Sequence, residues 1–166
     1  MPLAVERSIV LPAGKNKRER WARLATEAAR QSRRTGVMRI ADLTTLEDAV
    51  AALAGPARGA GGVAWYMSAG PGATPVAEAM DRIETAALQH GPVNLTLFVG
   101  PEGGWSPREI QRFDEAGLTG VKLTPTILRV ETAAVAAAAV VASVLAPRLA
   151  SRGARCSAGA DAAEAT

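Results

Sequence analysis

Short apolar runs alternate along this chain with longer amphipathic segments, a pattern that predicts strands separated by helices. The expected strands are residues 7–11, 37–40, 63–68, 95–99 and 120–123. The expected helices are residues 15–31, 46–53, 75–89, 106–116 and 131–145, with a Gly/Pro/Ala loop at residues 55–62. This order favours an α/β fold with a mostly parallel sheet and helices on both of its faces.

Residues 98–110 (FVGPEGGWSPREI) join the end of an apolar strand, a glycine-rich turn and a helix start. The glycines and the proline of the turn bend the backbone sharply and leave its amides uncovered. Ser106 fits the N-cap of the helix, Pro107 its first position and Glu109 the acidic position of a capping box. Gly117 fits the helix end. Open α/β sheets hold ligands where strand, turn and helix follow in this order, so we expect a cofactor site here.

The composition is typical of one domain with an aliphatic core, since 48% of the 166 residues are apolar and only 4% are aromatic. We expect this domain to span residues 1–147, because residues 148–166 are mainly Ala, Gly, Ser and charged residues and predict a disordered tail. The single cysteine, Cys156, lies in that tail, which excludes an intramolecular disulfide and a cysteine metal site. Its isolation is typical of a cytoplasmic protein.

No segment resembles a signal peptide, because charged residues rather than an apolar run follow the first few positions. The apolar run at residues 133–146 has about 14 residues, fewer than the roughly 20 that span a bilayer. We therefore expect no membrane partner, and a buried helix or a subunit contact for this run.

Positive charge is concentrated near the start of the chain. Residues 1–40 carry a net charge of +7 and residues 41–166 carry −4, which gives the net +3 of the whole chain. Such a basic segment is typical of proteins that dock phosphate groups. Residues 15–34 also fit an amphipathic helix with a solvated charged face, so both interpretations stay open at this point.

A family resemblance rests on two motifs, GPEGG at residues 100–104 and VKLTPTILRVETAA at residues 121–134. In this order and at this spacing they closely resemble the carboxyl-terminal signature of the RsmE-type ribosomal RNA methyltransferases, usually Leu-Gly-x-x-Ile-Leu-Arg-x-Glu-Thr-Ala. The segments ERS at residues 6–8 and EAARQSRR at residues 27–34 resemble the family's Glu-Arg-Ser and Glu-Ala-Ala-x-Gln-Ser-Gly-Arg. The likeness covers roughly residues 5–146.

The resemblance implies a SPOUT-type enzyme, in which the last strands and helix thread into a trefoil knot, a rare exception to the rule that chains do not thread loops. It implies methyl transfer from S-adenosyl-L-methionine to N3 of a uridine, number 1498 in the family's target, in the 16S ribosomal RNA of the small ribosomal subunit. It also implies a homodimer with the alanine-rich last helix near the interface. By the same likeness the cofactor-binding residues are Ser68, Gly100, Pro101, Glu102, Gly103, Gly104, Leu123, Ile127 and Leu128.

Methyl transfer to uridine N3 requires a group that favours the anion, because this nitrogen carries a proton at neutral pH. We expect Arg129 to stabilise the negative charge on the uracil oxygens, and Glu131 to orient that arginine or accept a proton. Glu131 also fits the first turn of the last helix as a favourable dipole partner. The family match further suggests RNA phosphate contacts from Arg7, Arg33 and Arg34.

Three other residues have two interpretations each. His90, the only histidine, fits an exposed turn better than a proton shuttle. Trp105 fits base stacking and core or dimer packing equally well. Glu102 fits a backbone contact in the turn better than a catalytic base.

The chain departs from the family pattern at Thr124, where glycine is normal, at Thr126, where arginine is common, and at Arg33, where glycine is usual. A threonine at a position that needs positive φ would weaken cofactor binding. Family members usually begin with a small β-barrel RNA-binding domain of the PUA type, and this chain begins at about the linker that follows it.

The alternative function is a non-catalytic RNA- or nucleotide-binding dimer on a knotted scaffold, in which Thr124 closes the pocket. A dinucleotide-binding enzyme fits less well, because GPEGG lacks the Gly-x-Gly-x-x-Gly spacing of the pyrophosphate turn.

Overall fold

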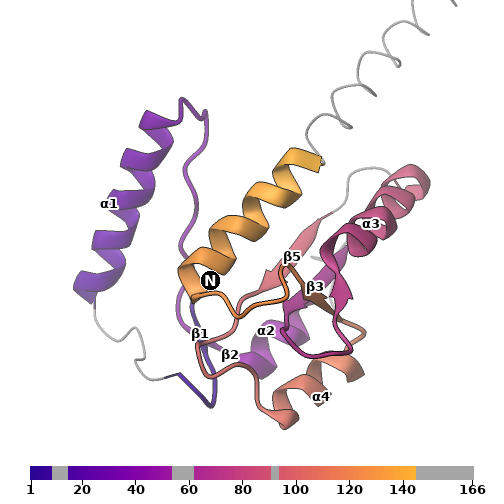
Figure 1. The fold of residues 1–166 in the computed structure, drawn as a ribbon. Coiled ribbons are helices and arrows are strands. Elements are labelled where there is room, and N and C mark those ends of the chain that lie inside the picture. Colours follow the sequence, from indigo (N-terminus) through magenta and orange to yellow (C-terminus); the bar gives the residue numbers. More distant parts are fainter. Residues whose placement is uncertain (9–14, 54–61, 91–93, 145–166) are drawn as a thin grey trace, which may run out of the picture.

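The computed structural model describes residues 1–8, 15–53, 62–90 and 94–144 of the chain. Its central sheet consists of β3 (Val63–Met67), β4 (Thr74–Pro75), β5 (Leu95–Phe98) and β6 (Thr119–Lys122). The strands lie in the order β4-β6-β3-β5, and every pairing between them is parallel (Figure 1). Tyr66 of β3 pairs with Phe98 on one side and with Gly120 on the other. The parallel α/β sheet expected from the sequence is therefore confirmed.

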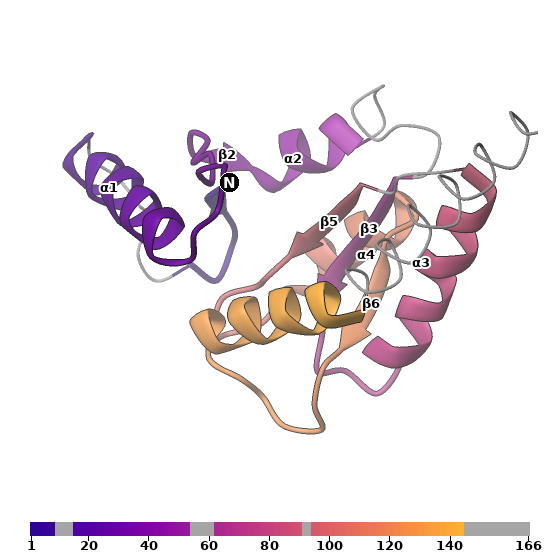
Figure 2. The same cartoon turned by 90° about the horizontal axis from the view of Figure 1, so that it is seen from above.

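Helices cover both faces of this sheet (Figure 2). α2 (Leu46–Leu53) and α4 (Pro107–Glu115) pack on one face, and α3 (Val76–His90) and the helix of residues 130–144 pack on the other. The alternation of side chains along β3 explains the two layers, because successive residues of a strand face opposite sides. Ala64 and Tyr66 belong to the cluster under α2 and α4, whereas Trp65 belongs to the cluster under α3.

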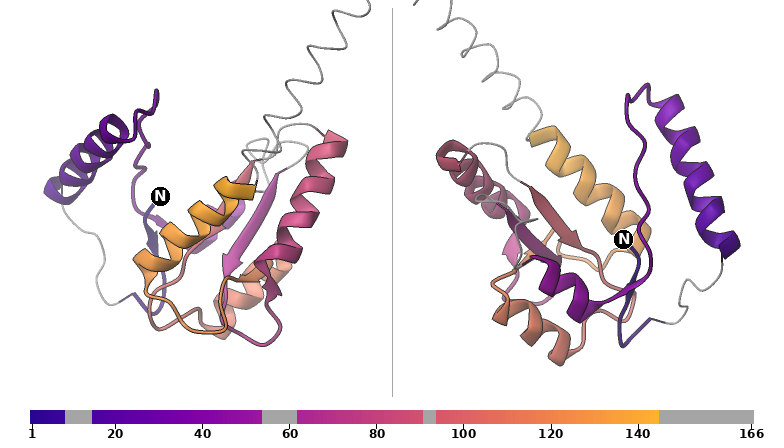
Figure 3. Two further views of the ribbon diagram at one scale, coloured as in Figure 1. Left: turned by 45° about the horizontal axis from the view of Figure 1, so that its top comes forward. Right: turned by 180° about the vertical axis from the view of Figure 1, so that it is seen from behind.

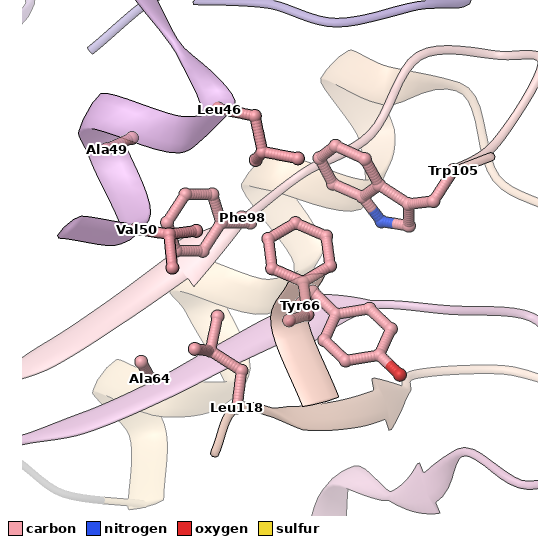
Figure 4. Packing of buried hydrophobic residues seen from close by; sticks show 9 residues of the cluster. Leu46, Ala49, Val50, Ala64, Tyr66, Phe98, Trp105 and Leu118 are labelled. Atoms are coloured by element: carbon pink, nitrogen blue, oxygen red, sulfur yellow. The ribbon is translucent and has the colours of Figure 1, made fainter. Parts of the chain in front are cut away.

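The first of these layers is organised around Phe113 of α4, whose side chain is completely buried. Its ring stacks on Tyr66 with the centroids 4.7 Å apart, and it meets Trp105 edge-on at 4.8 Å. Figure 4 shows Tyr66, Phe98 and Trp105 gathered with Leu46 of α2. Burial of one such aromatic side chain contributes roughly 1.5–3 kcal/mol to stability. Because Trp105 belongs to the glycine-rich turn, this layer anchors the turn in the core.

The amino-terminal part forms its own two-stranded parallel ladder, in which β1 (Leu3–Ala4) pairs with β2 (Thr44–Thr45). Between these strands in sequence, α1 (Lys15–Gln31) stands outside the sheet and its covering helices (Figures 1 and 3). An ion pair between Arg18 and Asp42 links α1 to the segment that returns to β2.

α1 and α4 both end with a residue in the left-handed region. In α4 this residue is Gly117 (φ 70°), and the N–H of Leu118 donates to the carbonyl oxygen of Phe113 at 2.9 Å. In α1 the residue is Arg33 (φ 53°), and the equivalent hydrogen bond across the helix end is 3.0 Å long. Arg33 therefore adopts a conformation that favours glycine, the residue usual at this position in the family.

Most of the predicted elements are confirmed to within one or two residues. The exceptions are short. Residues 7 and 8 lie in a turn, closed by a hydrogen bond from the N–H of Ser8 to the carbonyl oxygen of Val5, so the strand expected there is wrong. The strand expected at residues 37–40 is also wrong, because Val37 and Met38 are 50% and 66% exposed and face no partner strand.

Several predictions fall on residues that the structure does not describe. These are residues 9–11 of the first expected strand, residues 55–61 of the loop expected at residues 55–62, and the tail at residues 148–166 with Cys156. Within the described ranges, none of the helices combines the length and apolar character that crossing a bilayer requires.

Candidate functional site

Three loops meet at one edge of the sheet, because β6, β3 and β5 are parallel neighbours and their carboxyl ends lie together. The loops and the start of the 130–144 helix enclose a cavity of about 200 Å³. All nine residues predicted to bind the cofactor line this cavity: Ser68, Gly100, Pro101, Glu102, Gly103, Gly104, Leu123, Ile127 and Leu128. Eight further residues that were not predicted to bind the cofactor also line it: Met67, Ala69, Val99, Trp105, Thr124, Thr126, Val130 and Ala133. The structure thus brings residues from three distant segments into one pocket.

Hydrogen bonds fasten two of the loops to neighbouring strands of the sheet. The N–H of Ser68 donates to the carbonyl oxygen of Val121 at 2.9 Å, which ties the first loop to β6. The indole Nε1 of Trp105 donates to the carbonyl oxygen of Met67 at 2.9 Å, which ties the second loop to β3. Trp105 is 7% exposed and packs in the core, so of its two interpretations the structure supports core packing.

The glycine-rich turn has the conformation that its sequence predicts. The N–H of Gly104 donates to the carbonyl oxygen of Pro101 at 2.8 Å, and Gly104 has a φ of 68°. A Cβ on Gly100 would lie 2.9 Å from the ring of Trp105, which is closer than side chains pack. Both positions therefore require glycine, one for its conformation and one for the space.

The capping box at the start of α4 is confirmed and does more than cap the helix. Ser106 Oγ accepts from the N–H of Glu109, and Glu109 Oε2 accepts from the N–H of Ser106 at 2.7 Å. The other oxygen of Glu109 accepts from the N–H of Glu6 at 3.0 Å. Glu109 is 4% exposed, and its carboxylate connects the amino-terminal segment to the helix that follows the glycine-rich turn. The sequence pattern reveals the capping box but not this second contact.

Thr124 lies on the wall of the third loop, where its Oγ1 donates to the carbonyl oxygen of Thr126 at 2.7 Å. Among the described residues, Arg33 is the one non-glycine residue with a positive φ. The backbone penalty expected at Thr124 is therefore wrong, since this residue has an ordinary conformation. The closed pocket of the alternative function is also wrong, because Thr124 lines an open cavity.

Neither of the two predicted catalytic residues lines the cofactor pocket, although their sequence neighbours Leu128 and Val130 do. Arg129 is exposed, and its carbonyl oxygen accepts from the N–H of Ala133 at 2.8 Å in the first turn of the 130–144 helix. Glu131 is exposed in the same turn and lines a second cavity of about 660 Å³. The two cavities share part of one wall, formed by residues 99–102, Trp105 and Val130.

The three predicted RNA-binding arginines separate into two places. Arg7 lies against the glycine-rich turn, where its Nη1 donates to the carbonyl oxygens of Gly103 at 2.7 Å and Trp105 at 3.3 Å. Arg33 and Arg34 are exposed at the end of α1 and line neither of the two cavities. No local sequence signal reveals the contact between Arg7 and Gly103.

Tyr66 is a titratable residue that does not line the pocket. Burial, and then the neighbouring Asp114 carboxylate, raise the pKa of Tyr66, whose hydroxyl donates to Asp114 Oδ1 at 3.2 Å. His90 is the last residue of α3 rather than part of the following loop.

Comparison with known families shows that the RNA methyltransferase domain matches residues 1–142. The chain belongs to this family. The resemblance predicted from the GPEGG and ILRVETAA motifs is thereby confirmed. The matched residues include all the described helices and strands before the 130–144 helix and most of that helix.

Relatives within the RNA methyltransferase family carry the RsmE name. The chain is 32% identical over 150 residues to the ribosomal RNA small subunit methyltransferase E of Synechocystis, covering 87% of this chain and 44% of the relative. It is 33% identical over 136 residues to the enzyme of that name from Bacillus subtilis, covering 80% and 50%. The chain thus spans about half the length of the curated relatives it matches.

The fold of the chain also matches that of a solved structure. The structure of ribosomal RNA small subunit methyltransferase E from Neisseria gonorrhoeae, bound to S-adenosyl methionine, matches with a TM-score of 0.69 at 28% identity. The match covers 86% of this chain and 53% of that one.

Proposed function

We propose that this chain is the cofactor-binding and catalytic domain of an S-adenosyl-L-methionine-dependent methyltransferase that acts on small-subunit ribosomal RNA. The methyl acceptor is N3 of a uridine, position 1498 in 16S ribosomal RNA. The observation that carries the proposal is the convergence of nine residues from three loops on one cavity. The relative from Neisseria gonorrhoeae, which shares the fold, is bound to this methyl donor.

The pocket offers the two kinds of surface that a nucleoside needs. Backbone amides and carbonyls of residues 99–105 supply hydrogen-bonding groups for an adenine edge and a ribose. Leu123, Ile127 and Leu128 supply apolar cover for the ring. Ile127 is 80% exposed, and a bound ligand gives this large apolar side chain a partner.

The bound cofactor supplies an electrophilic methyl group, and the residues of the chain act on the base. Arg129 stabilises the negative charge that develops on the uracil oxygens as N3 loses its proton. Glu131 orients Arg129 or accepts the proton. Both residues adjoin Val130, which lines both cavities, and Glu131 lines the second one; this supports the assignment because the base must reach the methyl group from outside the cofactor pocket. Alignment of the reacting atoms supplies a further part of the rate.

RNA docks on the basic amino-terminal part. Residues 1–40 carry a net charge of +7, and Arg33 and Arg34 are exposed at the end of α1. Contacts from such arginines to phosphates give an affinity that falls with salt.

We further propose that the enzyme is a homodimer, that its chain forms a trefoil knot, and that it works in the cytoplasm. The exposed face of the 130–144 helix supports the dimer, because Ala134 and Ala138 are small enough for close approach of a second helix and Val135 is 70% exposed beside them. The path of residues 123–129 along the pocket wall, followed by a helix that packs back on the α3 face, supports the knot.

Calorimetry with S-adenosyl-L-methionine tests the pocket, and Ile127→Asn is the informative variant because an exposed side chain can be changed without disturbing the core. We expect one cofactor per chain and a Kd about tenfold higher in the variant, because apolar cover is lost. Val37→Asn, at another exposed aliphatic residue that lies outside the pocket, should leave Kd unchanged. The absence of heat at millimolar cofactor would overturn the proposal.

Methyl transfer is measured with labelled cofactor and small ribosomal subunits. We expect label in 16S RNA and a reverse-transcription stop at the target uridine, because methylation of N3 removes its Watson–Crick donor. Label at a different nucleotide would contradict the assigned acceptor while leaving the cofactor site intact.

A further inference from the structure

Arg7 contacts the glycine-rich turn with both its aliphatic stem and its guanidinium group. A Cβ on Gly103 would lie 3.3 Å from Cβ and 3.4 Å from Cδ of Arg7, so the stem packs directly on the glycine backbone. The Nη1 atom reaches beyond it to the carbonyl oxygens of Gly103 at 2.7 Å and Trp105 at 3.3 Å. These two carbonyls flank Gly104, the residue of the turn with a positive φ.

Two peptide planes of the turn are consequently held at both ends. In a trans peptide the carbonyl and the following N–H point in opposite directions, so fixing one fixes the other. The plane between Gly103 and Gly104 is held by Arg7 on its oxygen and by the carbonyl of Pro101 on its N–H, at 2.8 Å. The plane between Trp105 and Ser106 is held by Arg7 on its oxygen and by a buried carboxylate on its N–H, at 2.7 Å.

That carboxylate belongs to Glu109, which also contacts the turn formed by residues 5–8 near the amino terminus. Its second oxygen accepts from the N–H of Glu6, the residue before Arg7. The turn itself is closed by the hydrogen bond from Ser8 to Val5 at 3.1 Å. The side chain of Arg7 therefore binds the Gly103 end of the segment 103–109, and the backbone N–H of Glu6 binds its Glu109 end.

We propose that Arg7 is a positioning residue that sets the shape of the cofactor-binding turn, so that docking of residues 3–8 and binding of the cofactor stabilise each other. The inference rests on the proposed function for the identity of the ligand. It replaces the role of RNA phosphate contact expected for Arg7 from the sequence. Because coupling between two sites is reciprocal, cofactor must protect the amino-terminal segment by the same factor by which that segment raises cofactor affinity.

The test compares Arg7→Ala and Arg7→Lys with Arg108→Ala, which removes the same charge from an exposed residue in the first turn of α4. A hydrogen bond from a charged donor predicts a cofactor Kd about tenfold higher in Arg7→Ala. Arg7→Lys should recover part of this loss, and Arg108→Ala should bind like the wild type. In turnover assays the KM for cofactor should rise in Arg7→Ala, while kcat at saturating cofactor stays the same.

Amide hydrogen exchange, measured by NMR without cofactor, tests whether Arg7 holds the glycine-rich turn in place. The amides of Gly104 and Ser106 should exchange about tenfold faster in Arg7→Ala than in Arg108→Ala. Added cofactor should slow exchange in residues 3–8 of the wild type but not in Arg7→Ala.

Equal cofactor affinity in Arg7→Ala and the wild type would overturn the proposal, as would weaker RNA binding with unchanged cofactor binding. If the wild type binds no cofactor, the proposed function fails, and the exchange rates of Gly104 and Ser106 alone decide whether Arg7 positions the turn.

Discussion

The indole Nε1 of Trp105 donates a hydrogen bond to the carbonyl oxygen of Met67 at 2.9 Å, so the loop after β5 is joined to the end of β3. Both residues line the candidate cofactor pocket. The same tryptophan occupies the space beside Gly100 and meets the ring of Phe113 in the core. One side chain thus links the packing of the α4 layer to the shape of the pocket.

Trp105→Phe should reduce both stability and cofactor affinity. The substitution leaves the Met67 carbonyl without its donor, at a cost of about 1–3 kcal/mol in the free energy of unfolding. Denaturant unfolding and cofactor calorimetry measure the two effects. Trp65→Phe is the matched control, because Trp65 is 3% exposed in the other core cluster and lines neither described cavity. It should lower stability without changing Kd, and an equal change in Kd would contradict the role given to Trp105.

Arg33→Gly should stabilise the protein. Arg33 has a φ of 53° at the end of α1, a conformation that costs a residue other than glycine about 1 kcal/mol. Relief of this cost should raise Tm by about 2–4 °C in a chain of this length. Arg34→Gly removes the same charge at a residue that has no positive φ, so it should not raise Tm. A similar increase in both variants would show that charge, rather than backbone conformation, is responsible.

Tyr66 should ionise above its ordinary pKa of 10.0, because burial and then the Asp114 carboxylate disfavour the phenolate. Tyr66 is the single tyrosine of the chain, so the ultraviolet absorbance of phenolate reports it alone. Asp114→Asn should bring the midpoint down, since it removes the neighbouring negative charge. An unchanged midpoint in this variant would contradict the electrostatic contribution.

The same shift makes stability depend on alkaline pH. The unfolded chain releases the Tyr66 proton at its ordinary pKa, whereas the folded chain holds it to higher pH. The contribution is therefore fully present below about pH 10 and is lost as the pH rises through the raised pKa of the folded state. Tyr66→Phe should flatten this part of the profile of unfolding free energy against pH.

Arg129→Ala should lower kcat for methyl transfer by about 100-fold, the size of effect that loss of one group stabilising a developing negative charge produces. Cofactor Kd should stay the same, because Arg129 does not line the cofactor pocket. Arg82→Ala serves as the control, since Arg82 lies on α3 in an exposed ion pair with Glu78. Normal turnover in Arg129→Ala, with intact cofactor binding, would remove Arg129 from the mechanism.

Local signals in the sequence account for the elements that carry the pocket. β3 is an apolar run that follows Gly62, β5 is a mainly apolar run that ends shortly before Gly100, and the start of α4 has a capping box that depends only on residues 106–109. Two-residue strands such as Thr74–Pro75 carry no periodicity and therefore escape a pattern-based prediction. Val37 and Met38 led to a strand prediction that is wrong, because they are apolar residues that lie exposed on the surface.

Some features of the candidate site could likewise be predicted from the sequence, and others could not. The family resemblance carried by GPEGG and the segment VKLTPTILRVETAA is what identifies the three loops, whereas the glycine-rich turn alone is evident from its residue types. The contact from Arg7 to Gly103 joins residues 96 positions apart, and only the folded chain brings them together. The conformation of Thr124 also needed coordinates, because its residue type alone suggests a strain that the backbone avoids.

Every strand pairing among the described residues is parallel, so each pair comes from segments that a helix separates in sequence. Such chains fold slowly, because no hairpin offers an early local contact. The third wall of the pocket is contributed by residues 123–133, which follow β3, β5 and α4. A ligand stabilises only states that already contain its complete site. A ligand of this pocket therefore cannot stabilise a nascent chain until residue 133 has left the ribosome, and before that point only the packing of the earlier strands and helices can do so.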